Sequence, residues 1–178
     1  WQKFILNNDI LWFKGHLFNH SVIQLIEDLQ LIENNNLVDF FSEFDGFFAA
    51  VFKRQELVIA LVDSVCSIPL FYSEINGVVT LDSHAPSLVK KEGLIEFNND
   101  TILALSMSGF TINKDTIYKE LIAIKPGHLI VFENEQPINI IQNYQYQPWK
   151  MVENSRTNYQ KELAKITLEI LKKVIKEL

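Results

Sequence analysis

The chain has 178 residues and a formal net charge of −6 at pH 7, and it is 48% hydrophobic and 21% charged. These values are typical of a folded globular protein and exclude extended disorder. The acidic balance, without a concentrated run of lysine and arginine, argues against nucleic-acid binding. The single cysteine excludes an internal disulfide framework, and no apolar run approaches the roughly 18–20 residues of a membrane span. Because no signal peptide is visible either, we expect a cytoplasmic protein.

The predicted strands come in hairpins. Two apolar runs, Phe47–Phe52 and Leu57–Val62, flank a short polar connection at residues 53–56, which are charged except for Gln55. Since both runs are apolar at nearly every position, we expect this hairpin at the centre of a sheet that is covered on both faces. Further strands are predicted by alternation or by turn residues at 3–6, 10–18, 70–73, 78–82, 128–133 and 138–143, with a partly extended segment at 118–124.

Helices are predicted where apolar residues recur at spacings of three and four. They cover Val22–Leu29, Leu37–Phe44, His84–Lys90, Thr101–Met107 and the C-terminal segment from about residue 157. Polar residues that can cap the first, fourth and last of these are Asn19 or Ser21, Asn99 or Asp100, and Thr157 or Asn158. Strands in hairpins with a few helices predict an α+β fold with antiparallel sheets.

The C-terminal helix is predicted to be amphipathic. Its apolar stripe includes Leu163, Ile166, Ile170 and Val174, and lysine and glutamate residues cover the other face. The charged face is best explained as a solvated surface, whereas the stripe is a candidate docking surface for a partner. The sequence stops within this helix without a capping residue, which predicts that the chain continues in a longer protein.

The residues taken one by one do not form a complete catalytic site. His16 and His20 are four positions apart, but the first lies in a predicted strand and no glutamate or cysteine completes a metal set. Cys66 has no nearby histidine in the sequence and no helix N-terminus to lower its pKa, so a packed thiol is favoured over a nucleophile.

Several stretches in order carry a family resemblance. Lys14–His20 (KGHLFNH) stands where the family has NGEIYNH, and Phe44–Ala49 (FDGFFA) where it has LDGxFA. Ala60–Tyr72 (ALVDSVCSIPLFY) stands where the family has ARDxxGxxPLYY. Gly109–Gly127 resembles a later segment of the family that ends in Pro-Gly. Together these stretches resemble the N-terminal, class II glutamine amidotransferase domain of the asparagine synthetase family. The resemblance implies an Ntn-hydrolase-like αββα sandwich of two mainly antiparallel sheets flanked by helices.

The departures from the family's motifs argue against glutaminase activity. The chain starts with Trp1 and shows no Met-Cys-Gly stretch, although the family's nucleophile is an N-terminal cysteine. Lys14 replaces the asparagine of the Asn-Gly pair that forms the oxyanion hole, Val62 replaces the arginine of the ARD motif, and Cys66 replaces a glycine. We therefore predict no catalytic residue and no metal ligand, and only a remnant of a ligand pocket at Lys14, Gly15 and Asp63.

The resemblance also implies a place in a larger enzyme. Residues 1–155 would form an amidotransferase-like domain without its nucleophile, and residues 156–178 a helix that leads into a missing ATP-pyrophosphatase (synthetase) domain. β-Lactam synthetase and the lasso-peptide cyclases are relatives of this kind. The chain itself would then bind no cofactor, whereas ATP and Mg would belong to the synthetase part, which is the expected partner. Neither nucleic acid nor membrane is an expected partner, and a homodimer remains open.

Two alternatives stay open at this point. The first alternative is a stand-alone binding or interaction domain for a small ligand or a peptide. The second is a glutaminase domain whose N-terminal cysteine has been removed, in which case a Met-Cys-Gly sequence would precede Trp1.

Overall fold

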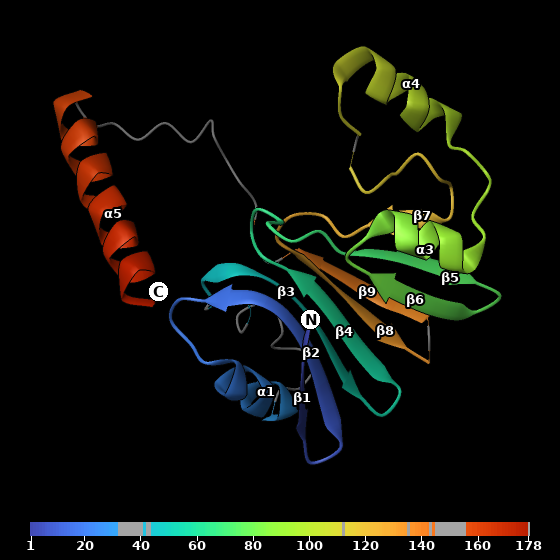
Figure 1. Ribbon diagram of the computed structural model, residues 1–178, viewed down its shortest axis with the longest axis horizontal. Coiled ribbons are helices and arrows are strands. Elements are labelled where there is room, and N and C mark those ends of the chain that lie inside the picture. Colours follow the sequence, from blue (N-terminus) through green and yellow to red (C-terminus); the bar gives the residue numbers. More distant parts are fainter. Residues whose placement is uncertain are drawn as a thin grey trace. The chain divides into compact units, whose positions relative to one another are not determined.

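The computed structural model describes residues 1–31, 41, 44–111, 113–134, 136–142, 144 and 156–177, without the side chains of residues 138, 156–159, 173, 174, 176 and 177. The chain divides into two compact units, Trp1–Tyr144 and Gln145–Leu178. The first unit holds both sheets and the helices α1, α3 and α4, and the second holds the helix α5 (Figure 1). The boundary predicted after residue 155 falls outside the described residues and stays a prediction.

The larger sheet has six antiparallel strands in the order β1-β2-β3-β4-β8-β9. Its strands are β1 (Gln2–Leu6), β2 (Asp9–Leu17), β3 (Gly46–Arg54), β4 (Leu57–Val62), β8 (His128–Glu133) and β9 (Gln136–Gln142). The β3–β4 hairpin lies at the centre, as its two-sided apolar pattern predicted. The strand predicted from residue 138 begins earlier, at Gln136, because β9 is an edge strand and an edge tolerates Pro137.

The smaller sheet has three antiparallel strands in the order β6-β5-β7. They are β5 (Phe71–Ile75), β6 (Val78–Asp82) and β7 (Leu121–Ala123), so the predicted hairpin and the partly extended segment are both confirmed. Asn76 and Gly77 join β5 to β6 with φ values of 53° and 80°. Two successive residues with positive φ are typical of the tight turn whose twist matches that of a hairpin.

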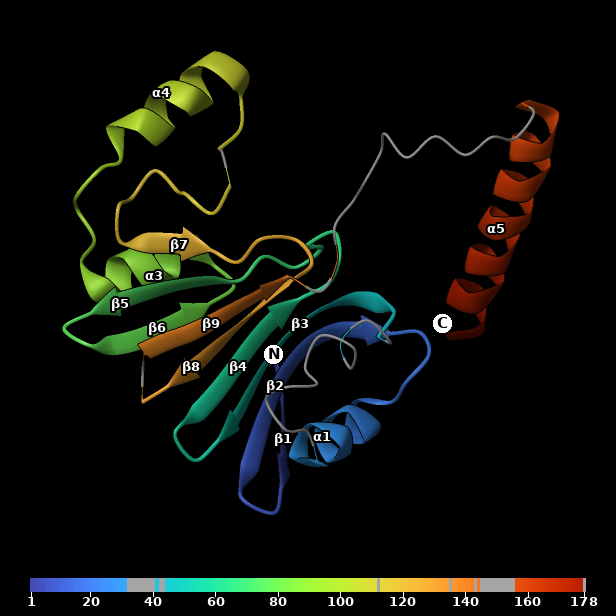
Figure 2. The same ribbon diagram turned by 180° about the vertical axis from the view of Figure 1, so that it is seen from behind.

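The two sheets and two helices are stacked as layers (Figures 1 and 2). Leu25, Ile26 and Leu29 of α1 (Val22–Leu31) are buried in one core with the larger sheet. The opposite face of that sheet shares a second core with the smaller sheet, in which Tyr72 meets Phe132. Leu88 of α3 (Ala85–Glu92) is buried in a third core on the outer face of the smaller sheet. The order helix, sheet, sheet, helix is the predicted αββα sandwich, and the fold class is confirmed.

Local hydrogen bonds define where two helices begin. Ser21 Oγ accepts from the Gln24 backbone N–H at 3.1 Å, while Gln24 Oε1 accepts from the Ser21 backbone N–H at 3.0 Å. This reciprocal pair caps α1 and selects Ser21 over Asn19. For α4 (Asn99–Ser108) the predicted caps, Asn99 and Asp100, are wrong. Asn98 caps the helix, because its side chain accepts from the Thr101 N–H at 3.2 Å.

The last helix, α5, covers Arg156–Glu177 and so begins before Thr157 and Asn158. The predicted caps therefore lie inside the helix, since apolar spacing fixes the face of a helix and leaves its first turn undefined. The helix predicted over Leu37–Phe44 falls outside the described residues, except for 41 and 44. Within the part of the chain that the structure describes, every helix is too short or too polar to cross a lipid bilayer.

Candidate functional site

Lys14 and Gly15 lie in the middle of a strand pair, where β2 runs beside β3. Lys14 is exposed and pairs with Ala49, and Gly15 pairs with Phe48. Gly15 has φ +116°, and a Cβ at this position would overlap the carbonyl oxygen of Phe47. The glycine is therefore required by the close approach of the two strands. This structural demand accounts for Gly15 without any ligand.

Asp63 follows β4 and is buried, with 4% of its surface exposed. Its carboxylate accepts hydrogen bonds from the backbone N–H groups of Phe48 (3.1 Å), Val65 (2.9 Å) and Ser67 (3.0 Å), and from Ser67 Oγ (3.3 Å). Its backbone carbonyl also accepts from Gly127 N–H at 3.0 Å. The side chain thus ties β3 to the loop after β4 and satisfies the negative charge with donors from its own chain.

The predicted pocket residues are therefore neighbours around Phe48, which pairs with Gly15 and donates to Asp63. They form a packed junction of strands. Two recesses of the first unit, described below, are lined by other residues.

Val62 and Cys66 stand where the motif that the sequence resembles has an arginine and a glycine. Val62 is 2% exposed and packs in the core between the two sheets. Cys66 is half-buried in a left-handed conformation with φ 56°, and its Sγ lies 3.8 Å from the Ile124 carbonyl oxygen. Burial, followed by the negative charge of Asp63, raises the pKa of the Cys66 thiol. The cysteine is therefore a neutral thiol at neutral pH, which is unsuited to nucleophilic attack.

The two candidate histidines make aromatic contacts. The rings of His16 and Phe18 are 5.6 Å apart, and those of His20 and Phe44 are 4.7 Å apart. Searched over the described residues, the structure holds no group of three or more His, Cys, Asp or Glu side chains that could bind a metal ion.

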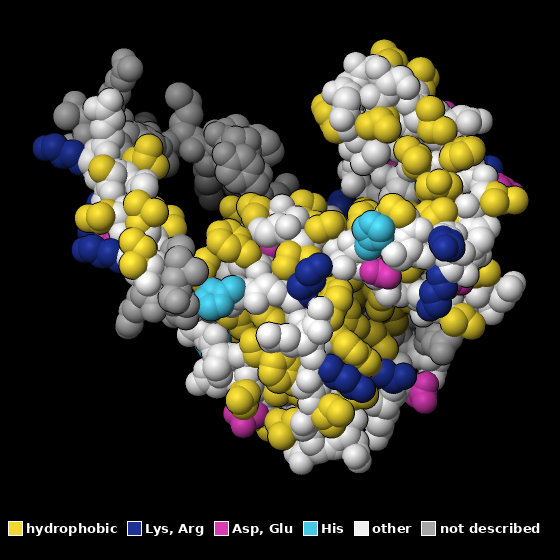
Figure 3. Space-filling model, in the orientation of Figure 1, with side chains coloured by type: hydrophobic (Ala, Val, Ile, Leu, Met, Phe, Trp, Pro, Cys, Tyr) yellow, Lys and Arg dark blue, Asp and Glu magenta, His cyan; other side chains and the backbone are white. Residues whose placement is uncertain are grey.

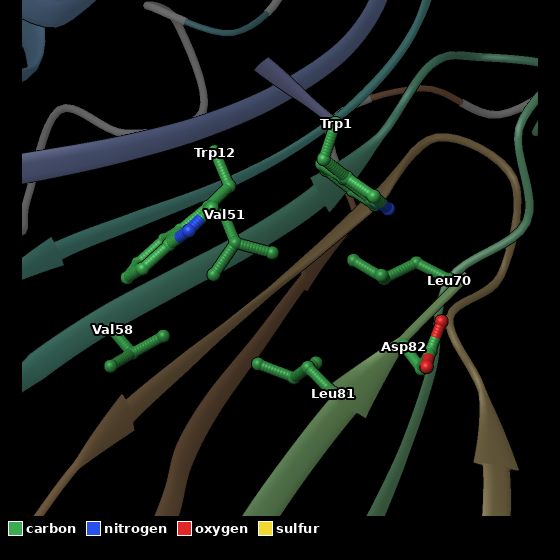
Figure 4. Close-up of a pocket in the computed structure, with 7 residues that line it drawn as sticks. All are labelled: Trp1, Trp12, Val51, Val58, Leu70, Leu81 and Asp82. Atoms are coloured by element: carbon green, nitrogen blue, oxygen red, sulfur yellow. The ribbon is translucent and has the colours of Figure 1, made fainter. Parts of the chain in front are cut away.

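Sequence reasoning missed two recesses in the first unit. An apolar recess of about 420 Å³ lies between β6 of the smaller sheet and the strands β2, β3 and β4 of the larger sheet (Figure 4). It is lined by Trp1, Trp12, Val51, Val58, Leu70, Leu81 and Asp82. A more polar recess of about 450 Å³ includes Tyr72, Glu74, Lys114 and Glu120. Their residues come from distant parts of the sequence, and no local pattern connects them.

The predicted docking residues lie on α5, in the second unit. Leu163, Ile166 and Ile170 are 65%, 47% and 51% exposed, and the side chain of Val174 is outside the described set. Leu168, Leu171 and Ile175 of the same helix are also exposed. Figure 3 shows hydrophobic side chains along this helix. An exposed apolar surface of this kind is typical of a helix that packs against another surface.

Comparisons with known proteins find likenesses among solved structures. No family model matches the chain, and no curated protein matches it. Among solved structures it is similar to glutamine phosphoribosylpyrophosphate (PRPP) amidotransferase from B. subtilis, complexed with ADP and GMP, at 14% identity and a TM-score of 0.45. The likeness covers 82% of this chain and 32% of that one, so the chain spans about a third of that protein's length. At this TM-score the likeness carries no argument, and the fold class rests on the layers described above.

Proposed function

We propose that the chain is a non-catalytic, amidotransferase-like domain of an asparagine-synthetase-related, ATP-dependent amide-forming enzyme. It acts as a scaffold or partner for the synthetase part. The observation that supports this proposal most is the hydrogen bonding of Asp63, whose carboxylate accepts from Phe48, Val65 and Ser67 of its own chain. A group that holds its own backbone in this way supports the fold and is not free to bind a substrate.

The other departures support the same conclusion. Glutamine hydrolysis needs an activated nucleophile and donors for the developing oxyanion. Cys66, the single cysteine of the chain, has a raised pKa and is half-buried. Val62 contributes a buried apolar side chain where a cationic group would be needed to hold a carboxylate. The chain thus has an amidotransferase-like fold, but an apolar side chain packs at Val62, where glutamine hydrolysis would require a polar one.

The exposed apolar surface of α5 is the proposed contact with the synthetase part. Burying Leu163, Ile166 and Ile170 against a partner would remove three large apolar side chains from water. ATP and Mg would bind to that partner, which supplies the adenylation chemistry, while this chain contributes surface and orientation.

The test mixes the chain with an ATP-pyrophosphatase subunit or domain from the same organism. That partner is recognised by the SGGxDS loop that binds pyrophosphate. We expect a stable complex and ATP-dependent release of pyrophosphate with an amine and a carboxylate substrate, but no ammonia release from glutamine. The double substitution Leu163→Ser and Ile166→Ser should lower the affinity of the complex at least about tenfold. The matched change Glu169→Gln on the charged face should leave the affinity unchanged. Failure to form a complex would sink the proposal.

The same ammonia assay decides between the proposal and an active glutaminase. Glutamine hydrolysis by the chain, or by a form extended upstream of Trp1, would replace the proposal with the glutaminase alternative. A stand-alone binding domain is favoured by a different observation, the polar recess.

A further inference from the structure

The polar recess lies between the smaller sheet and the edge of the larger one. Tyr72 and Glu74 come from β5, Ile122 from β7 and Ile140 from β9, while Lys114 and Glu120 come from the segment before β7. Its volume of about 450 Å³ is in the range of small-molecule sites. All these residues belong to the first unit. Nothing in the proposed scaffold role uses them.

Tyr72 brings a hydrogen-bond donor to this recess. The residue is 4% exposed, and its ring packs edge-on against Phe132 with centroids 5.4 Å apart. The hydroxyl group has no hydrogen-bond partner among the described residues. Burial, followed by the negative charge of Glu74, raises the pKa of Tyr72, so the hydroxyl keeps its proton. Among the described residues, the hydroxyl oxygen does not belong to the buried polar atoms that lack a partner, so it is accessible and can donate to a ligand in the recess.

Glu120 brings an unsatisfied acceptor to the same recess. Its Oε2 atom is buried and has no hydrogen-bond partner in the described part of the chain. Glu74 adds a second carboxylate, whereas Lys114 adds one ammonium group, and both of these are exposed. Two carboxylates against one ammonium favour a ligand with a positive charge. Ile122 and Ile140 supply apolar surface between these polar groups.

We propose that the polar recess binds a small basic amino acid, a zwitterion that carries a further ammonium group on an aliphatic stem. The ammonium group meets the carboxylates of Glu120 and Glu74, the stem packs on the isoleucines, and the carboxylate meets the Tyr72 hydroxyl and Lys114. The buried Glu120 Oε2 atom would gain a donor in this arrangement, and the Tyr72 hydroxyl would gain an acceptor.

Calorimetric titration of the full chain with L-lysine tests the proposal, with L-norleucine as the matched control. The two compounds share the amino-acid group and the stem, and only lysine carries the second ammonium group. Physiological salt screens exposed charges over about 8 Å, so weak surface attraction is suppressed. We expect lysine to bind at least about tenfold more tightly than norleucine. Equal binding of the two, or no heat at millimolar lysine, would overturn the proposal.

Two conservative variants locate the site. Glu120→Gln and Tyr72→Phe keep the size of each side chain, and each should weaken lysine binding about tenfold because one charge-assisted contact is lost. Glu27→Gln on the exposed face of α1 and Tyr144→Phe, an exposed residue that does not line the recess, should change binding less than about twofold. If the control pair weakens binding as much as the recess pair, the binding is non-specific and the proposed site is wrong. The proposed scaffold role is unaffected by either outcome, because it is tested by complex formation through α5.

Discussion

Replacing Asp63 with asparagine separates a structural role for this residue from a ligand-binding role. Asparagine has nearly the same shape as aspartate, but its side-chain NH₂ cannot accept a hydrogen bond. In the structure, Oδ1 accepts from Val65 N–H at 2.9 Å, and Oδ2 accepts from Phe48 N–H at 3.1 Å. Whichever way the amide turns, one backbone N–H loses its acceptor and faces a donor.

The magnitude follows from the burial of this cluster. A hydrogen bond to a charged group contributes about 1.5–3 kcal/mol, and an unsatisfied buried donor adds a desolvation penalty of about 1–3 kcal/mol. Because Asp63 is only 4% exposed, solvent cannot replace the lost acceptor. We expect the variant Asp63→Asn to lower the free energy of unfolding by about 2–4 kcal/mol. That is a large part of the roughly 5–15 kcal/mol by which most domains are stable.

Urea unfolding followed by tryptophan fluorescence measures this change, provided that the slope of the transition stays constant. Asp100→Asn, an exposed aspartate in the first turn of α4, is the matched control and should change the free energy by less than about 1 kcal/mol. A loss below about 1 kcal/mol for Asp63→Asn would refute the structural role. The carboxylate would then be available for binding, and the interpretation of Lys14, Gly15 and Asp63 as a ligand pocket would be favoured.

Two further predictions concern the same junction of strands. Gly15→Ala should destabilise the protein by about 3 kcal/mol or more, because its Cβ would overlap Phe47, whereas Gly93→Ala, with φ +68° and open space around it, should lose only about 1 kcal/mol in the same urea assay. The Cys66 thiol should react slowly with a disulfide reagent near pH 8, because burial and then Asp63 raise its pKa above the ordinary 9.0. Since the folded pKa is the higher one, Cys66 stabilises the fold fully below the unfolded pKa and loses this contribution as the pH rises through the folded pKa. Cys66→Ala should therefore flatten the fall in stability above about pH 9, and an unchanged alkaline profile would contradict this cause.

The sequence predicted the centre of the fold because two-sided burial leaves a local signal. Phe47–Phe52 and Leu57–Val62 are apolar on both faces, and such runs occur where a sheet is covered on both sides. Asn76-Gly77 likewise has backbone angles that few other pairs adopt. The first residue of β6, Val78, was therefore predicted correctly. Helix starts were less well predicted, as Asn98 and Arg156 show, because several neighbouring polar residues can cap a helix and only the structure selects one.

The candidate site was harder to predict. Asp63 was identified by its place in a motif. A local signal was also present, because an aspartate followed by serine residues often accepts from backbone N–H groups a few positions on, as Asp63 does from Val65 and Ser67. The polar recess had no such signal. Tyr72, Lys114 and Glu120 meet because β5 and β7 are neighbours in the smaller sheet, and that pairing is fixed by tertiary packing.

The residues that match the resembled motifs and those that differ from them have different physical roles. Gly46 is kept, and a Cβ there would overlap the His16 carbonyl oxygen, so the β2–β3 pair depends on it. Asp63 is kept, and it holds the loop after β4. Of the positions that differ, Lys14 is exposed and Val62 is a buried apolar residue, whereas Cys66 has a positive φ of 56° where the motif has a glycine. Gly46 and Asp63 therefore support the fold, whereas Lys14 and Val62 are compatible with the fold and do not supply the polar chemistry of the motif. A chain that needs only the αββα framework as a surface for other proteins or ligands would show this division, whereas an active glutaminase would need both sets.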